Sequence, residues 1–188
     1  AQSLDMESPR VRAMIAEADT FFVASYLDDA NGRHVDASHR GGKSGFVRIN
    51  DDGSLTIPDF AGNLHFNTLG NILLNPKVGL VFPDFATGDM LHLTGDAEVV
   101  LESDEIAAFQ GAERLWVFRP RKIVLRPAAL PLRFVMRAEG WSPNSLMTGD
   151  WEQAEQRRKA AERGSTWRPL RVAKIVDESS VIRSFHLE

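Results

Sequence analysis

The chain has 188 residues, with 22 lysines and arginines against 26 aspartates and glutamates, five histidines and no cysteine. That length fits one domain with its own core, and contents of 43% hydrophobic and 26% charged residues are those of a globular protein, neither disordered nor globally basic. The absence of cysteine excludes disulfides, thiolate zinc sites, cysteine-ligated iron–sulfur clusters and thiol nucleophiles. No apolar run approaches the roughly 18 residues of a membrane helix and the start is no signal peptide, so we expect a cytoplasmic protein without a membrane partner.

A helical segment at the start is followed by a series of short strands. Apolar residues recur at helical intervals over residues 7–19 and predict an opening helix. Runs rich in aromatic and β-branched residues then predict strands over residues 21–27, 34–39, 46–50, 55–57, 77–82, 90–101 and 115–125, the last interrupted at Pro120. Turn signals such as Asn-Gly at 31–32 separate them, and short helices are predicted over 68–74 and 103–111. Many short strands with few helices favour a mainly β protein, an antiparallel barrel or sandwich.

The C-terminal part of the chain begins with a predicted helix. Asp150 is placed to cap a helix over residues 151–163. Glu155 and Lys159 form a favourable i,i+4 pair, and Gly164 is expected to end the helix.

A linker and a strand pair follow this helix. Residues 165–169 predict the linker, and residues 171–176 and 181–187 predict strands on either side of a turn. Because a lone hairpin is marginally stable in water, the pair either docks on the barrel or opens a second domain. We therefore divide the chain into a domain over residues 1–164 and, over residues 165–188, a linker with the expected start of a truncated second domain. The missing initiator methionine suggests that the other end was also trimmed.

A loop after the second predicted strand has the composition of an anion site. Residues 37–44 (ASHRGGKS) match a loosened P-loop pattern, but the FVRIND that follows is typical of a strand, whereas a P-loop needs a helix there. We therefore do not predict an NTPase. Cations, hydroxyls and nearby glycines still suit an anion, with a solvated hairpin loop as the alternative. The side chains concerned are Ser38, His39, Arg40, Lys43 and Ser44.

A second polar cluster surrounds the helix predicted over residues 68–74. Its members are Asp59, Asn63, His65, Asn67, Thr68 and Asn71. Asn67 or Thr68 is expected to cap the helix, but one helix needs one cap, so the surplus amides suggest a ligand with several oxygen atoms. Helix capping alone is the alternative interpretation. The histidines lack metal-binding spacing and no GxSxG motif occurs, so we predict neither a metal site nor a serine hydrolase.

One segment departs from the acidic balance of the chain. Residues 114–137 contain seven basic residues and no acidic one. Such a segment either meets an anion, with nucleic acid as one case, or pairs with acidic groups elsewhere in the fold. Because Trp116, Val117 and Phe118 are typical of a core strand, we favour the second interpretation and do not expect nucleic-acid binding; a steeply salt-dependent DNA affinity would be the sign of it.

Three segments resemble the pyridoxamine 5′-phosphate oxidase-like family of FMN-binding split barrels: VDASHRGGKSGFVRIND, LTIPDFAGNLHFNTLGNILLNPKVGLVFPDF and LHLTGDAEVV. The resemblance extends over residues 21–151. It implies a split β-barrel with a few flanking helices, FMN as the cofactor, and a homodimer that holds FMN in the groove between its subunits.

The resemblance also implies which residues bind FMN: Ser38, His39, Arg40, Lys43, Ser44, Asn63, Asn67, Thr68 and Asn71. Ser38 and His39 are expected beside the ring, and Arg40 and Lys43 at the phosphate. Asn67 and Thr68 stand where the oxidases carry an Arg-Lys pair. Phosphate binding must therefore depend on Arg40, Lys43 and backbone amides, or be weaker.

Other segments bear on the reaction. The closing strand with which true oxidases grip pyridoxamine phosphate is missing, so we do not expect a B6 vitamer as substrate. RPAALPLRF and WSPNSLMTGDW resemble a branch fused to a reductase, and RPLRVAKIVDESSVIRSFHLE is similar to the first strands of ferredoxin-reductase-like FAD domains, which implies an NAD(P)H-dependent reductase, fused or separate, as partner.

We therefore expect the FMN-binding domain of a flavin-dependent oxidoreductase that transfers hydride or electrons. A hydride can pass between stacked rings without an acid or base, so no catalytic residue is predicted. The alternative is a non-catalytic flavin or haem carrier or sensor on the same fold.

Overall fold

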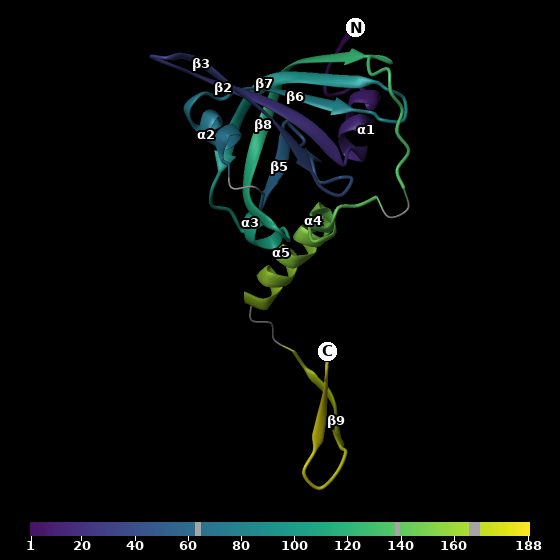
Figure 1. The fold of residues 1–188 in the computed structure, drawn as a ribbon. Helices are drawn as coiled ribbons and strands as arrows, with labels where there is room; N and C mark the ends of the chain where they lie inside the picture. The colour runs from purple at the N-terminus through teal and green to yellow at the C-terminus, as the bar shows by residue number, and fades with distance from the viewer. Residues whose placement is uncertain (63–64, 138–139, 166–169) are drawn as a thin grey trace.

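The computed structural model describes residues 1–62, 65–137, 140–165 and 170–188, and its main feature is one curled antiparallel sheet (Figure 1). The strands of this sheet are β1 (Gln2–Leu4), β2 (Thr20–Asp29), β3 (Gly32–Gly41), β4 (Arg48–Ile49), β5 (Leu55–Phe60), β6 (Lys77–Pro83), β7 (Met90–Val100) and β8 (Ala112–Arg126). The helices are α1 (Pro9–Glu17), α2 (Asn67–Leu74), α3 (Asp104–Ala108), α4 (Pro143–Leu146) and α5 (Trp151–Ser165). A separate hairpin consists of β9 (Val172–Asp177) and β10 (Arg183–Leu187).

The strand order explains why the barrel is split. The order is β3-β2-β6-β7-β8-β5-β4, with β1 added beside β8, and within the described residues the edge strands β3 and β4 do not pair with each other. Alternate residues of each strand point inward, as in β2, where Phe21 and Val23 are buried while Phe22 and Ala24 are exposed. Buried side chains of β2, β5, β6, β7 and β8 form the main core around Trp116, and a smaller cluster lies around Phe109. The predicted mainly β fold, a split antiparallel barrel with a few flanking helices, is confirmed.

Strand β8 differs from its prediction because it continues through Pro120. Pro120 lies opposite Gly95 and Lys122 opposite Thr94, so Arg121 is an extra residue in a β-bulge. A bulge tolerates proline because no ladder hydrogen bond is required of its nitrogen. The backbone of Arg119 approaches Gly95 so closely that a Cβ at residue 95 would overlap its carbonyl oxygen. Gly95 and the bulge at Arg121 together allow β8 to continue through Pro120 without a break.

Several other elements differ in length from the predictions. Strand β4 has two residues, Arg48 and Ile49, which pair with β5, while Phe46 and Val47, predicted to be part of it, are buried just before the strand. Helix α3 is a short helix capped by Ser103, whose Oγ accepts the Glu105 amide at 3.1 Å. Strand β1 and helix α4 lie in segments for which no element was predicted.

Helix α5 confirms its predicted cap and ion pair. The Asp150 carboxylate accepts the amide of Gln153 at 2.8 Å, and Lys159 lies 3.2 Å from Glu155. The helix extends to Ser165, the last residue described in this part of the chain and two beyond the predicted range of 151–163, so Gly164 does not end it. Within the described chain, no helix is long and apolar enough to cross a membrane.

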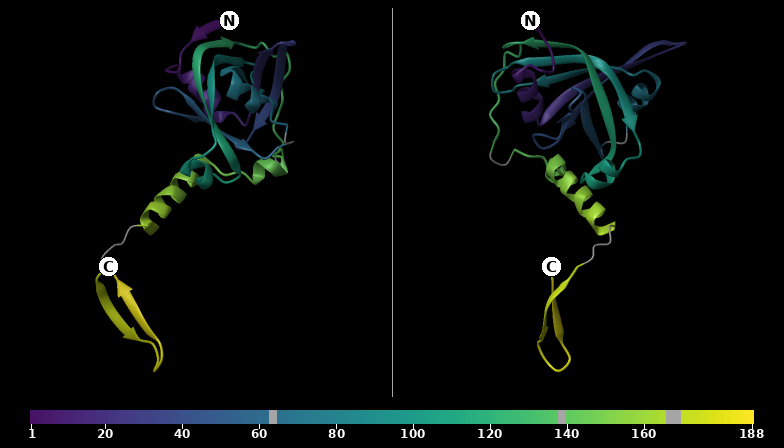
Figure 2. Two further views of the ribbon diagram at one scale, coloured as in Figure 1. Left: turned by 90° about the vertical axis from the view of Figure 1, so that its left-hand side faces the viewer. Right: turned by 180° about the vertical axis from the view of Figure 1, so that it is seen from behind.

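The hairpin beyond α5 lies away from the barrel in all three views (Figure 2). Its two strands pair antiparallel, as predicted, with Phe185 opposite Ile175. Most of the predicted linker lies outside the described residues. The division into residues 1–164 and 165–188 therefore stays a prediction.

Candidate functional site

A cavity of about 240 Å³ lies between the barrel and the segment that precedes α5. On the barrel side its lining comes from the end of β3, from β5 and the residues after it, from the start of α2 and from β8. On the other side it is lined by residues around α4, namely Ser142, Asn144, Ser145 and Thr148. Segments far apart in sequence therefore meet at one polar cleft, which makes it the candidate site.

A cluster of charged side chains lines the barrel side of this cavity. Asp59 of β5 is buried; its carboxylate accepts Nε of Arg114 at 3.0 Å and lies 3.8 Å from Nε of Arg40. Burial raises the pKa of Asp59, and the two guanidinium groups oppose that effect. Arg114 also pairs with Glu113, which lines the cavity as well, so two arginines and two carboxylates meet in this cluster.

Arg40 carries the clearest sign of an unfilled hydrogen bond. Its Nε is buried and has no hydrogen-bond partner among the described residues, because 3.8 Å to Asp59 is too long for a hydrogen bond. A buried donor without an acceptor is costly. An anionic oxygen within reach of Nε would supply that acceptor, and the placement of Arg40 at a phosphate stays a prediction.

The start of α2 is open at the same cavity. Phe66 occupies the cap position, lines the cavity and makes no side-chain cap, so the prediction that Asn67 or Thr68 caps the helix is wrong. Asn67 is exposed at the first helical position. Among the described residues no side chain accepts a first-turn amide of α2, and such amides suit an acceptor.

Three other predicted site residues attach α2 to the sheet. Ser38 Oγ lies 2.8 Å from Thr68 Oγ1, and Thr68 donates to Asp36 at 2.5 Å. Because Thr68 gives its proton to Asp36, Ser38 is the donor in the first contact. Asn71 donates to Ser25 Oγ at 3.1 Å. The surplus polar groups thus have protein partners, and a ligand role for Ser38, Thr68 and Asn71 stays a prediction.

The remaining predicted residues are divided between the cavity and its surroundings. His39 lines the cavity together with Arg40, while its ring packs against Phe22 at 5.7 Å on the outer side of the sheet. Lys43 and Ser44 lie in the turn after β3 and do not line the cavity. Lys43 is half-buried, and its ammonium has no hydrogen bond or ion pair among the described residues. Asn63 lies outside the described residues.

The basic segment over residues 114–137 lies largely on β8, where it meets acidic partners. Arg114 pairs with Asp59, Arg119 with Glu98 at 3.3 Å, and Arg121 with Asp96. These pairs support the interpretation that the segment balances acidic groups of neighbouring strands. Arg114 lies opposite Asp59 in the β5–β8 register, and this pairing brings it into the lining of the cavity.

Comparison with known proteins gives a general likeness of fold. No protein-family model and no curated protein matches the chain. The structure is similar to HupZ of Group A Streptococcus (17% identity, TM-score 0.47, covering 65% of this chain and 96% of that one). It is also similar to a putative pyridoxamine 5′-phosphate oxidase from Lactobacillus delbrueckii (16% identity, TM-score 0.47, covering 66% and 99%). HutZ, the haem storage protein from Vibrio cholerae, is similar too (16% identity, TM-score 0.42, covering 68% and 97%). At such low sequence identities and TM-scores, the cofactors and reactions of these proteins cannot be assigned to this chain.

Proposed function

We propose that the chain is the FMN-binding domain of a flavin-dependent oxidoreductase. The observation that carries this proposal is the buried, unpartnered Nε of Arg40 at a cavity that also contains the open start of α2. Arg40 and the first-turn amides of α2 would bind the phosphate, with Lys43 adding a second cation. FMN would supply the hydride or electron transfer that no side chain of this chain can perform. An NAD(P)H-dependent reductase, fused or separate, would supply the electrons.

The size of the cavity bears on how much of FMN one subunit can hold. About 240 Å³ is below the roughly 300–1,000 Å³ typical of pockets that enclose a whole small ligand. One chain would therefore hold the phosphate end and leave part of the ring to be covered by another surface. This shortfall supports a site completed by a second subunit.

The outer face of the sheet is where we place that second subunit. Phe22 and Val35 are 46% and 70% exposed there, beside the small residues Ala24 and Gly79. A groove of about 490 Å³ crosses this face and is lined mainly by apolar atoms. His39 lines the cavity and its ring lies 5.7 Å from that of Phe22, at a tilted angle, so the face adjoins the cavity. We propose that a second copy packs here, and Val35→Arg should convert a dimer into a monomer in sedimentation velocity.

Haem is the second candidate cofactor, for a carrier or sensor without turnover. His39 and His65 line the cavity, and imidazole is a common axial ligand of haem iron. The visible spectrum of the purified chain separates the candidates, since flavin and haem absorb in different bands. Consumption of NAD(P)H by the flavin-loaded protein with a reductase separates an oxidoreductase from a carrier.

Comparison of FMN with riboflavin, which lacks the phosphate, tests the site directly. We expect Arg40→Ala combined with Lys43→Ala to weaken FMN binding by about 10- to 100-fold, the size of one or two charge-assisted hydrogen bonds. Riboflavin affinity should change little. Lys122→Ala combined with Arg126→Ala removes the same charge from the exposed side of β8 and should leave both affinities unchanged. Equal FMN affinity in the two double variants would refute the assignment.

A further inference from the structure

Residues 140–165, here called the arm, form one side of the candidate cavity. Ser142, Asn144 and Ser145 of the arm face the barrel residues across it. The arm is fastened to the turn after α3, where Gly149 donates its amide to the Gln110 carbonyl at 3.0 Å. The shape of the cavity therefore depends on where the arm is seated.

Trp151, the first residue of α5, connects the arm to the barrel wall. Its indole Nε1 donates to the carbonyl oxygen of Phe46 at 2.8 Å. The indole ring lies against the Arg48 guanidinium, 4.0 Å from the ring centroid, and its edge meets Phe109 at 4.8 Å. One side chain thus contacts the end of the Lys43 turn, strand β4 and the segment after α3.

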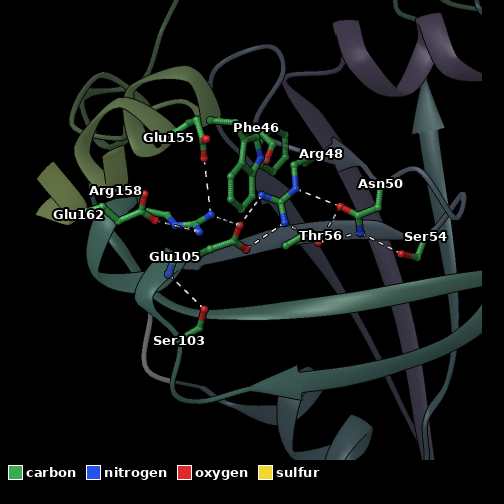
Figure 3. Close-up of polar contacts among 11 residues, drawn as sticks. Phe46, Arg48, Asn50, Ser54, Thr56, Ser103, Glu105, Glu155, Arg158 and Glu162 are labelled. Carbon is green, nitrogen blue, oxygen red and sulfur yellow. Dashed lines mark hydrogen bonds and ion pairs between the residues drawn. The ribbon is translucent and has the colours of Figure 1, made fainter. Parts of the chain in front are cut away.

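Arg48 is itself held by a network that includes α5 (Figure 3). Its two terminal nitrogens donate to both carboxylate oxygens of Glu105 at 2.8 and 2.9 Å, and its Nε donates to Asn50 at 3.0 Å. Glu105 also lies 3.4 Å from Arg158, one of the α5 residues. The guanidinium beneath Trp151 is therefore fixed, and so is the ring that lies on it.

The carbonyl that Trp151 binds ends the turn between Arg40 and Phe46. Gly41 and Phe46 both line the cavity, and the amide of Phe46 donates to the Lys43 carbonyl at 3.0 Å. The Phe46 ring lies so close to Gly42 that a Cβ there would be 2.6 Å from the ring. Core packing therefore fixes the Phe46 side chain, while Trp151 fixes its backbone and the path of the turn that carries Lys43.

We propose that Trp151 is a positioning residue of the cofactor site, through which the seating of the arm sets the affinity for the flavin phosphate. This inference rests on the proposed function. Movement of α5 would change the Trp151–Phe46 contact and with it the path of the turn between Arg40 and Phe46, both of which line the cavity.

Replacement of Trp151 by phenylalanine tests the proposal, because phenylalanine keeps an aromatic ring but loses the donor. The matched control is Trp141→Phe, the same change in the same arm at a residue with no side-chain hydrogen bond among the described residues. We expect Trp151→Phe to accelerate amide exchange of residues 42–47 in the flavin-free protein. We also expect it to weaken FMN binding by about 3- to 10-fold, the size of one hydrogen bond, with little change for riboflavin. The control should show neither effect.

The ratio of FMN to riboflavin affinity distinguishes positioning from simple destabilisation, which would lower both affinities alike. If the wild type binds FMN and Trp151→Phe has the same ratio of FMN to riboflavin affinity, the inference is overturned and the proposed function stays intact. Absence of FMN binding by the wild type would overturn both. If Trp151→Phe does not fold, Arg48→Lys replaces it. This variant keeps the charge but loses the bidentate contact, and the same fall in the ratio is expected, whereas an unchanged ratio refutes the inference.

Discussion

Replacement of Arg48 by methionine removes the central cation of the network that joins the barrel to α5, in which Arg48 contacts Glu105 and Trp151. Methionine keeps most of the side-chain length. Arg48 and Glu105 are 33% and 24% exposed, so their paired hydrogen bonds are partly screened by water. Charge-assisted bonds of this kind contribute about 1.5–3 kcal/mol when shielded, and contact with an aromatic ring adds about 0.5–1 kcal/mol. After discounting for exposure, we expect Arg48→Met to lower the free energy of unfolding by about 2 kcal/mol in urea titrations at neutral pH.

The pH dependence of that loss follows from Glu105. The hydrogen bonds from Arg48 are the largest cause that lowers the pKa of this carboxyl below its ordinary 4.5, against the opposing effect of burial. A carboxyl with a lowered folded-state pKa stabilises the fold fully above its unfolded value and loses that contribution as the pH falls through the folded value. The difference between wild type and Arg48→Met should therefore shrink at acid pH.

A double-mutant cycle isolates the pair. Combining Arg48→Met with Glu105→Gln should give a coupling energy of about 1–2 kcal/mol, because the two groups are in direct contact. The exposed pair Arg119–Glu98, whose side chains are 57% and 67% exposed, provides the matched control, with an expected coupling of about 0–0.5 kcal/mol. Equal couplings in the two cycles, or a loss for Arg48→Met that does not change with pH, would refute the reasoning.

Three further substitutions test individual contacts by the same unfolding measurement. Asp150→Ala removes the cap of α5 and should cost about 1 kcal/mol, whereas Asp150→Asn should cost much less. Gly95→Ala forces a Cβ into the carbonyl of Arg119 and should cost about 3 kcal/mol or prevent folding, while Gly70→Ala, with open space around it, should be tolerated. Thr68→Val leaves Asp36 without its donor and should cost about 1–3 kcal/mol, against little for Thr94→Val, whose exposed hydroxyl has no hydrogen bond among the described residues.

The strands were predictable where local pattern and burial agree. Phe21 and Val23 alternate with exposed neighbours in β2. The register of β2 with β3 places both side chains on the inner face of the sheet, as the alternation predicts. Pro120 was misleading because its effect depends on Gly95, a residue of another strand that no local rule associates with it. Strand β1 owes its existence to pairing with β8, which is a non-local contact. Local propensity predicts the element, and the partner strand decides where it ends.

The site was predictable in part. Arg40 and His39, which line the cavity, could be singled out because a strand that ends in cations and glycines has a recognisable composition. Asp59 and Arg114 meet only through the register of β5 with β8. From the sequence, Asp59 was assigned to the polar cluster before α2 and Arg114 to the basic segment over residues 114–137. The polar residues of the arm also line the cavity. Their local sequence predicts only that a helix follows them, and does not indicate that they meet the barrel.

Ser38, Thr68 and Asn71 show how the fold decides between two uses of the same residue types. Hydroxyls and amides gathered beside a helix start suit either a ligand or a docking surface, and their chemistry alone cannot separate the two. In the structure, Thr68 gives its proton to Asp36, which assigns it to helix docking. Arg40, from the same loop of sequence, has a buried nitrogen with no acceptor among the described residues. We therefore base the proposal for Arg40 on this unfilled hydrogen bond at the cavity, more than on the composition around it.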